Sequence, residues 1–362
     1  LPLPSMSVLM RAPQMLMDPN SPLVLRWRYL PRLMPWLMRF VSNASESTRM
    51  RNAVSMATLM KDTLSAYATV VDGSDAGQYI RRLGTLEVYK HRSSFNADAR
   101  ERDRMRLLGA QVEELDAEEV RQLEPNLSRD FRLGVYFPEC GHCLDPFRLT
   151  QALAGDVRAA GGRFVQAEVR DVEVGEAGVR RLLTDADPIE VEAMVLAAGA
   201  WSGPIAAALG SPVPLDTERG YHTVLHGVDG GIQRPVGERE SNIGLTQMVD
   251  GLRMGGTVEL AGLDAPPNYE RARIFYEKGR QVIPGLPPTE SVEITRWMGF
   301  RPTLPDYLPA LGPSPHHRNV WFAFAHQHLG LSLGARTGEL IATLVRGDEP
   351  DIDLTPFRPD RF

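Results

Sequence analysis

Three kinds of feature are scarce or absent in this chain of 362 residues. It has only two cysteines, too few for a fold built on disulfides, so a reducing compartment and a cytoplasmic location are expected. No apolar run approaches the roughly 18 residues that a membrane-spanning helix needs. Positive charge is in deficit, with a net charge of −6. This argues against a nucleic-acid partner, because phosphate binding needs a basic face.

The residues that are present are sufficient for a large core. Hydrophobic residues make up 43% of the chain, and a chain of this length is expected to form two domains rather than one. Its first 45 residues combine five arginines with aromatic and aliphatic side chains around a single acid, Asp18. This pattern predicts short amphipathic helices with an aromatic, basic face. Such a face suits either an anionic membrane surface or packing on the main body.

The segment from 145 to 199 has the most regular pattern. Asp145-Pro146 is typical of a helix start, and the helix is expected to reach about Ala160. Arg163–Val169 has the composition of a strand, a hairpin turns at Gly175–Gly178, and Val191–Gly199 is expected to be a buried strand. Together these elements are typical of one half of a dinucleotide-binding fold.

Between 213 and 294 the pattern changes to short strands separated by glycine turns, with one helix at Tyr269–Ile283. This predicts an antiparallel sheet backed by a helix, a suitable substrate-binding face. Elsewhere the sequence predicts helices at Glu46–Asp72, Ala97–Leu108 and Asp116–Leu123, and strands at Thr85–Tyr89 and Leu133–Phe137.

Two features near the C-terminus point to a ligand. Arg301 precedes a loop stiffened by three prolines, so its orientation is expected to be fixed. A fixed guanidinium can bind a carboxylate through two parallel hydrogen bonds, although a structural ion pair with Asp306 is the alternative. Phe324–Gly334 passes from a strand into a helix through a Gly/Ser turn. A helix start of this kind offers unpaired N–H groups to an electron-rich ligand.

Three segments carry a resemblance to a known family: G-F-R-P-T-L-P-D-Y-L-P-A-L-G-P at 299–313, F-A-H-Q-H-L-G-L-S-L-G at 324–334 and L-A-A-G-A-W-S at 196–202. They resemble the FAD-dependent D-amino acid oxidase superfamily, and most of all its D-amino acid dehydrogenase branch. The resemblance extends from about Leu16 to Phe357. It implies an α/β with α+β architecture of two domains. An incomplete, Rossmann-like FAD-binding domain would comprise 1–60, 140–212 and 296–362, and an antiparallel-sheet substrate domain 61–139 and 213–295.

The resemblance also implies roles for individual residues. Arg301, in an R-P-x-x-x-D pattern, would hold the substrate carboxylate. The strand end at Glu168 and Val169 would meet the adenosine half of FAD. Two turns would contact the flavin, the second mainly through backbone N–H groups; they contain Ala198, Gly199 and Trp201, and Gln327, His328, Leu329, Gly330, Leu331 and Ser332.

Three further side chains are candidates for the catalytic site. Tyr221 and His222 are candidates to line the substrate side of the flavin, although core packing explains Tyr221 equally well. His326 has a side chain suited to general-base chemistry, but the resemblance gives the main role in its turn to the backbone. The pair Cys140-x-x-Cys143 lacks a second pair and a following helix, so neither a metal site nor a redox site is expected.

One family feature has no counterpart in this sequence. The family's N-terminal βαβ unit carries a G-x-G-x-x-G turn for the pyrophosphate, and this motif does not occur in the chain. Because the chain opens with Leu1 rather than Met, we expect that its beginning is truncated. Without the unit, FAD would lose its phosphate anchor and the parallel sheet its central strands.

The activity implied is oxidation of a D-amino acid to a 2-oxo acid and ammonia, by hydride transfer to the flavin. The resemblance implies a quinone-linked electron acceptor, which a location peripheral to the inner membrane would suit. Sarcosine, glycine or D-hydroxyproline are alternative substrates on the same scaffold. A 2-hydroxy acid or glycerol phosphate is a less expected substrate. An inactive fragment that binds no flavin is the competing explanation from outside the enzymes.

Overall fold

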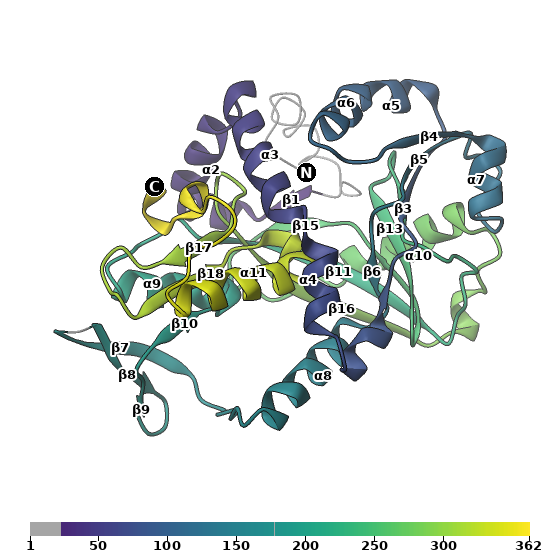
Figure 1. Ribbon diagram of the computed structural model, residues 1–362. Coiled ribbons are helices and arrows are strands. Elements are labelled where there is room, and N and C mark those ends of the chain that lie inside the picture. The colour runs from purple at the N-terminus through teal and green to yellow at the C-terminus, as the bar shows by residue number, and fades with distance from the viewer. Residues whose placement is uncertain (1–22, 177) are drawn as a thin grey trace.

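The computed structural model describes residues 23–176 and 178–362, which form a mixed α/β structure (Figure 1). Its main element is a ten-stranded sheet with the order β1-β15-β11-β14-β13-β12-β3-β5-β4, in which β16 also pairs with β11. The α/β class predicted from the sequence is confirmed. The strands are β1 (Leu23–Leu25), β3 (Thr85–Tyr89), β4 (Glu113–Asp116), β5 (Leu133–Phe137), β11 (Asp216–His226), β12 (Val236–Glu238), β13 (Ile243–Met248), β14 (Gly251–Gly255), β15 (Val258–Leu260) and β16 (Ile294–Thr303).

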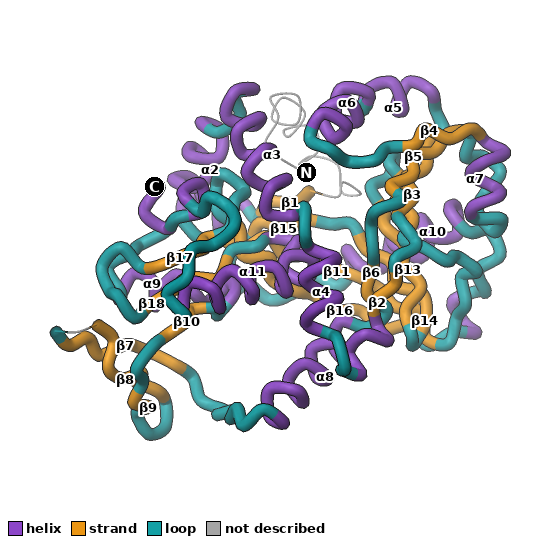
Figure 2. The backbone as a smooth tube through the Cα atoms, viewed as in Figure 1, coloured by secondary structure: helices purple, strands orange, loops and turns teal. Residues whose placement is uncertain are grey.

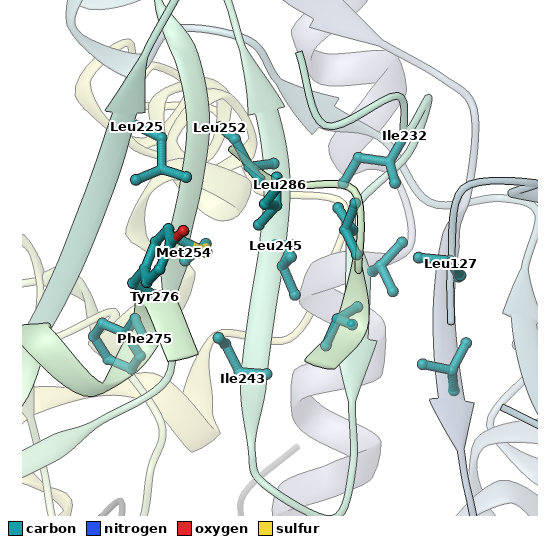
Figure 3. Close-up of a cluster of buried hydrophobic side chains, with 14 of the residues drawn as sticks. Leu127, Leu225, Ile232, Ile243, Leu245, Leu252, Met254, Phe275, Tyr276 and Leu286 are labelled. Carbon is teal, nitrogen blue, oxygen red and sulfur yellow. The ribbon is translucent and has the colours of Figure 1, made fainter. Parts of the chain in front are cut away.

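The two faces of this large sheet differ in character. On one face, apolar side chains pack against helix α10 (Glu270–Val282), as the sequence predicted (Figure 3). Leu225, Leu252 and Met254 belong to this core, together with Phe275 and Tyr276 of the helix. Successive side chains of a strand point to opposite faces, so the residues between them lie on the other face.

A second, smaller sheet has the order β10-β18-β17. β10 (Met194–Leu196) and β18 (Val320–Phe324) are parallel, and β17 (Ala310–Pro313) is antiparallel to β18. Figure 2 shows this sheet apart from β3, β5 and β13 of the large sheet. Helix α11 (Gly330–Val345) contacts β17 and β18, and α9 (Ser202–Ala208) contacts β10. The two turns that the sequence assigned to the cofactor therefore follow directly after two strands of this sheet, β10 and β18.

The remaining elements surround these two sheets. Helix α8 (Pro146–Ala159) starts as predicted, because Asp145 Oδ1 accepts a hydrogen bond from the Arg148 backbone N–H at 2.9 Å and Pro146 occupies the first turn. The helix predicted at 46–72 is divided into two helices, α3 (Glu46–Met60) and α4 (Thr63–Val70). The remaining helices are α2 (Leu30–Ser42), α3 (Glu46–Met60), α4 (Thr63–Val70), α5 (Arg92–Ala97), α6 (Ala99–Leu107), α7 (Ala117–Leu123) and α8 (Pro146–Ala159), and the strands are β2 (Ile80–Arg81), β6 (His142–Cys143), β7 (Val169–Gly175), β8 (Gly178–Thr184) and β9 (Ile189–Glu190).

The prediction of a strand at Arg163–Val169 is wrong for most of these residues. Regular structure begins only at Val169, the first residue of the β7–β8 hairpin. Phe164 and Val165 are 55% and 63% exposed. A buried parallel strand is stable only between neighbouring strands and helices, and no strand among the described residues pairs with 163–168. The segment therefore has the apolar pattern of a strand, but no neighbouring strand in the described chain pairs with it.

Two strands cross the domain boundaries that we expected. β1, from the 1–60 segment, pairs with β15 in the large sheet. β16 begins before residue 296 and pairs along its whole length with β11. The large sheet otherwise takes its strands from 61–139 and 213–295, and the division into two domains stays a prediction.

The N-terminal helix α2 packs on the main body through one face. Leu33 and Trp36 are buried beside Tyr307, and Trp36 Nε1 donates a hydrogen bond to the Thr303 carbonyl at 3.2 Å. Met38 lies outside this packed face and is 70% exposed. The part of this basic region before residue 23 lies outside the described residues. In the part of the chain that the structure describes, no helix is both long and apolar enough to cross a membrane.

Candidate active site

Arg301 lies on β16, opposite Glu218 of β11, on the face of the large sheet that α10 does not cover. Its Nη1 donates a hydrogen bond to the Thr257 carbonyl at 2.9 Å. Its side chain lies across Gly220, where an added Cβ would come within 2.3 Å of Nη2. Glycine at this position therefore leaves room for the guanidinium to lie along the sheet.

Arg301 has no ion-pair partner among the described residues. Asp306, the alternative partner expected from the sequence, binds Arg361 instead, at 2.6 Å. Burial lowers the pKa of Arg301, and the nearby Glu218 and Tyr307 partly oppose this shift. A half-buried guanidinium without a carboxylate partner is well placed to bind an anion.

His222 lies on the same face, two residues beyond Gly220 on β11. Its ring packs against Trp297 of β16, with 5.0 Å between the ring centroids. Arg253 of β14 approaches from the other side, with 3.4 Å between its Nη2 and His222 Nδ1. Burial, and then the positive charges of Arg253 and Arg301, lower the pKa of His222 to about 3. The imidazole is therefore neutral near pH 7.

Arg253 was missed by the sequence analysis, although a signal for it was present. The stretch G-L-R-M-G at 251–255 has one charged residue between two apolar ones. On a strand, this alternation places Leu252 and Met254 in the core and Arg253 on the opposite face. The structure shows this arrangement.

Tyr221 does not lie with these residues. Its side chain is on the core face and is 1% exposed. The hydroxyl donates to Glu259 Oε2 at 2.6 Å and accepts from the Asn268 backbone N–H at 2.9 Å. The packing explanation fits this position, so Tyr221 is left out of the proposed site.

The turn before α11 has an unusual backbone. Ala325 and Gln327 have φ values of +65° and +56°. These lie in the left-handed region, which residues other than glycine rarely adopt. The turn η5 (Gln327–Leu329) then leads directly into α11 at Gly330, and Leu329 at the N-cap provides no side-chain acceptor. The first N–H groups of α11 therefore have no side-chain cap and can bind an electron-rich ligand.

The two histidines of this turn have different surroundings. His326 Nε2 lies 3.0 Å from Thr337 Oγ1 of α11, and burial lowers the pKa of His326 to about 4. The imidazole of His326 is thus directed to the helix. His328 is exposed. This placement favours a role for the backbone of the turn over one for the His326 ring.

Tyr307 connects this turn to the face of the large sheet that carries Arg301 and Arg253, called the arginine face below. Gln327 Nε2 donates a hydrogen bond to the Tyr307 carbonyl, and the Tyr307 hydroxyl donates to the Glu218 carboxylate. Glu218 is the β11 partner of Arg301. Since β16 also contacts η5, the turn and the arginine are held in a fixed relation.

The other predicted cofactor turn also reaches β16. Trp201 packs edge-on against Phe300, next to Arg301, with 5.5 Å between the ring centroids. Gly199 has a φ of +56°, and a Cβ added there would meet no described atom within 4 Å. Ala198, beside it, is exposed. This turn therefore has open space on its outer side.

Glu168 and Val169 are not brought to this site. Both lie at the base of the β7–β8 hairpin, which projects from the main body (Figure 1). The backbone N–H of Glu168 donates to Asp185 Oδ1 at 2.8 Å, and its carbonyl accepts from the Asp185 N–H. Their contact with an adenosine stays a prediction.

Comparison with known proteins identifies the family. The family model described as DAO, FAD dependent oxidoreductase, matches residues 27–344. The chain belongs to the DAO family. A D-amino-acid oxidase from Bradyrhizobium diazoefficiens is 36% identical over 97% of this chain and 84% of its own length. A D-amino acid dehydrogenase from Paramagnetospirillum magneticum is 29% identical over 98% and 85%. Among solved structures, glycine oxidase from Bacillus cereus has a TM-score of 0.73 at 20% identity, with 84% of each chain covered.

DAO-family membership confirms that the chain is an FAD-dependent oxidoreductase. The described residues fit the flavin end of this cofactor. The uncapped start of α11 and the left-handed turn before it offer N–H groups, and the space outside Gly199 is open. β16, which carries Arg301 on the arginine face, contacts both turns.

Proposed function

We propose that this DAO-family protein oxidises D-amino acids to 2-oxo acids and ammonia. The observation that carries the proposal is Arg301, a fixed, half-buried guanidinium with no carboxylate partner in the described chain, beside the turn at Gln327–Ser332. The names of the relatives, D-amino-acid oxidase and D-amino acid dehydrogenase, support the substrate class.

Each part of the site has a role in this proposal. Arg301 holds the substrate carboxylate and so fixes the direction of the Cα–H bond. The N–H groups of Gln327–Ser332, with Ala198, Gly199 and Trp201, hold the flavin ring and favour added negative charge there. Bound FAD supplies the hydride acceptor. The neutral ring of His222 lines the substrate side. No side-chain base is required once the substrate amine is neutral.

We also propose that the electrons pass to a quinone-linked acceptor at a membrane surface. The exposed side of the α2 region supports this, because Trp27 and Met38 are 66% and 70% exposed and Arg28 and Arg39 are exposed beside them. The test compares reduction of a soluble quinone with oxygen uptake, and co-sedimentation with anionic and neutral vesicles. Rapid peroxide formation in air without quinone or vesicles would instead identify oxygen as the acceptor.

The substrate class is tested with the visible spectrum of the purified chain after FAD is added and free flavin removed. Anaerobic bleaching by D-amino acids, but not by their L-enantiomers, is the expected result. Bleaching by sarcosine, glycine or D-hydroxyproline alone would select the alternative amine substrates. Bleaching by 2-hydroxy acids or glycerol phosphate alone would overturn the amino-acid assignment. A chain that retains no flavin would favour the flavin-free fragment.

The role of Arg301 is tested by substitution. We expect Arg301→Met to lower kcat/KM at least tenfold, and Arg301→Lys to lose less, because lysine keeps the charge without the two-point geometry. Arg296→Met is the matched control, since Arg296 lies on the same strand but is exposed. Equal effects of Arg301→Met and Arg296→Met would contradict the proposed role.

A further inference from the structure

Arg253 shares an unusual property with Arg301. Of the arginines whose side chains the structure describes, every other one that is buried or half-buried has a carboxylate oxygen within 4.0 Å. Arg253 and Arg301 are half-buried and have none. Arg253 contacts only a neutral group at hydrogen-bond distance, the imidazole of His222. The site therefore contains two cations without a matching anion.

The strand register places both arginines on one face of the sheet. Arg253 is the β14 partner of Val224, and Arg301 is the β16 partner of Glu218. Val224 lies six positions after Glu218 on β11, an even step, so their partners point to the same side of the sheet. The two long side chains extend toward each other from opposite directions. Arg301 lies over Gly220, and Arg253 reaches the ring of His222.

The spacing of the two guanidinium groups follows from these contacts. Gly220 and His222 are two residues apart on β11, a separation of about 7 Å along a strand. A single carboxylate is too short to bind both groups in the two-point manner. A chain of a few carbon atoms with a carboxylate at each end has a suitable length. Gly299 on β16 and Gly255 on β14 are the partners of Gly220 and His222. Neither adds a side chain to this face, and the ring of Trp297 lies over Gly299.

The charges around the pair do not neutralise it. Burial lowers the pKa of Arg253, and the charge of Arg301 lowers it further. Glu218 is the acid closest in register, but it accepts a hydrogen bond from the Tyr307 hydroxyl and has no carboxylate oxygen within 4.0 Å of the Arg301 guanidinium. Burial raises the pKa of Glu218. Asp216, further along β11, is bonded to the Tyr29 hydroxyl. The face of β13 beside Arg253 contributes Thr246 and Gly244. Two half-buried like charges are stabilised when an anion binds each of them.

We propose that the substrate carries a second carboxylate, which Arg253 binds while Arg301 binds the α-carboxylate. The substrate class is thus an acidic D-amino acid with one or two methylene groups between Cα and the side-chain carboxylate. This inference rests on the proposed function, and it names Arg253 as the residue that determines side-chain specificity.

The kinetic test uses the FAD-loaded full chain and follows anaerobic flavin reduction. D-glutamate and D-aspartate are compared with D-glutamine, D-asparagine and D-alanine. We expect kcat/KM to favour the acids, and Arg253→Met to lower it about 10- to 100-fold for the acids, the effect of one charge-assisted hydrogen-bonded pair. For D-alanine, which has no second carboxylate, the loss should be smaller than for the acids. Arg253→Lys should recover part of the loss. Arg296→Met is again the control for net charge.

A binding test gives a readout that does not depend on turnover. Glutarate and butyrate are titrated calorimetrically into the wild-type chain and the Arg253→Met variant. We expect glutarate to bind more tightly than butyrate in the wild type, and about equally in the variant. Equal binding of the two acids by the wild type, or an unchanged preference in the variant, would overturn the inference.

The two proposals can fail separately. If neutral D-amino acids reduce the flavin as well as the acidic ones do, and Arg253→Met affects both alike, the specificity inference is wrong while the proposed function stands. If no amino acid reduces the flavin but glutarate still binds through Arg253, the proposed function is wrong and a dicarboxylate site is retained.

Discussion

Arg361 binds the carboxylate of Asp306 through two hydrogen bonds, Nε to Oδ2 at 2.6 Å and Nη2 to Oδ1 at 3.1 Å. Asp306 lies five residues after Arg301 and was its expected alternative partner. Because the C-terminal Arg361 takes this acid, the guanidinium of Arg301 keeps its capacity to bind an external carboxylate. The same ion pair fixes the loop between β16 and β17 to the end of the chain.

Loss of this ion pair should destabilise the protein. We expect Asp306→Asn to lower the free energy of unfolding by about 3 kcal/mol, because it leaves a mostly buried guanidinium without its partner. Arg358→Gln is the control. Arg358 pairs with Asp360 at the surface, where water screens the charges, so its loss should cost much less than the loss of Asp306. Urea denaturation followed by circular dichroism measures both, and equal losses would contradict the prediction.

Gly220 should be required for the position of Arg301. A Cβ at residue 220 would lie 2.3 Å from Nη2 and 2.5 Å from Cζ of Arg301, so the flexible guanidinium would have to move. We expect Gly220→Ala to raise KM for the amino-acid substrate about tenfold or more, with little loss of flavin binding. In the control, Gly237→Ala on β12, the added Cβ meets only Glu87 Cγ at 3.7 Å. A KM equal to that of Gly237→Ala would show that Arg301 has no fixed position.

Glu218 should make the protein less stable as the pH rises. Burial raises the pKa of this carboxyl above its ordinary 4.5, and the Tyr307 hydroxyl and Arg301 partly oppose the shift. The folded chain then binds the proton more tightly than the unfolded chain, so this stabilising contribution is complete below pH 4.5 and is lost as the pH rises through the raised pKa. Glu218→Gln should therefore gain stability relative to the wild type with increasing pH. Denaturation at several pH values tests this, with the exposed Glu290→Gln as control.

His326 should have the opposite effect on acid stability. Burial lowers its pKa from 6.5 to about 4, so the unfolded chain takes up the proton first. The stabilising contribution of the neutral ring is present above pH 6.5 and is lost as the pH falls toward 4. His326→Gln should flatten the stability curve in this window, whereas His316→Gln, at an exposed site, should not. If the two variants give the same curve, the ring of His326 is not buried in a neutral state.

The sequence predicted the fold where local patterns agreed with long-range pairing. Thr85–Tyr89 and Leu133–Phe137 became strands with the predicted bounds. Thr85–Tyr89 alternates in character, and both segments have neighbours in the large sheet. At Arg163–Val169 an equally apolar pattern gave no strand, because strand formation depends on partners that a local window does not contain. Whether a segment formed a strand therefore depended on pairing with neighbouring strands and not on its composition.

The candidate site was predicted in part for the same reason. Arg301 and the turn at Gln327–Ser332 could be recognised from short motifs that carry their own context. Tyr221 and His222 are adjacent in sequence, and only the register of β11 shows that their side chains point to opposite faces. Arg253 on β14 and Arg301 on β16 are brought together because both strands pair with β11. No short sequence window therefore contains both residues.

The polar face of the large sheet and the turn before α11 belong to separate sheets, joined through Tyr307. The side chains that would select a substrate are thus carried by one sheet, and the N–H groups that would contact the flavin by another. A change at Arg253 can alter which molecule is accepted without altering the backbone that would hold the flavin. Such a division allows substrate choice to evolve while the redox machinery is inherited unchanged.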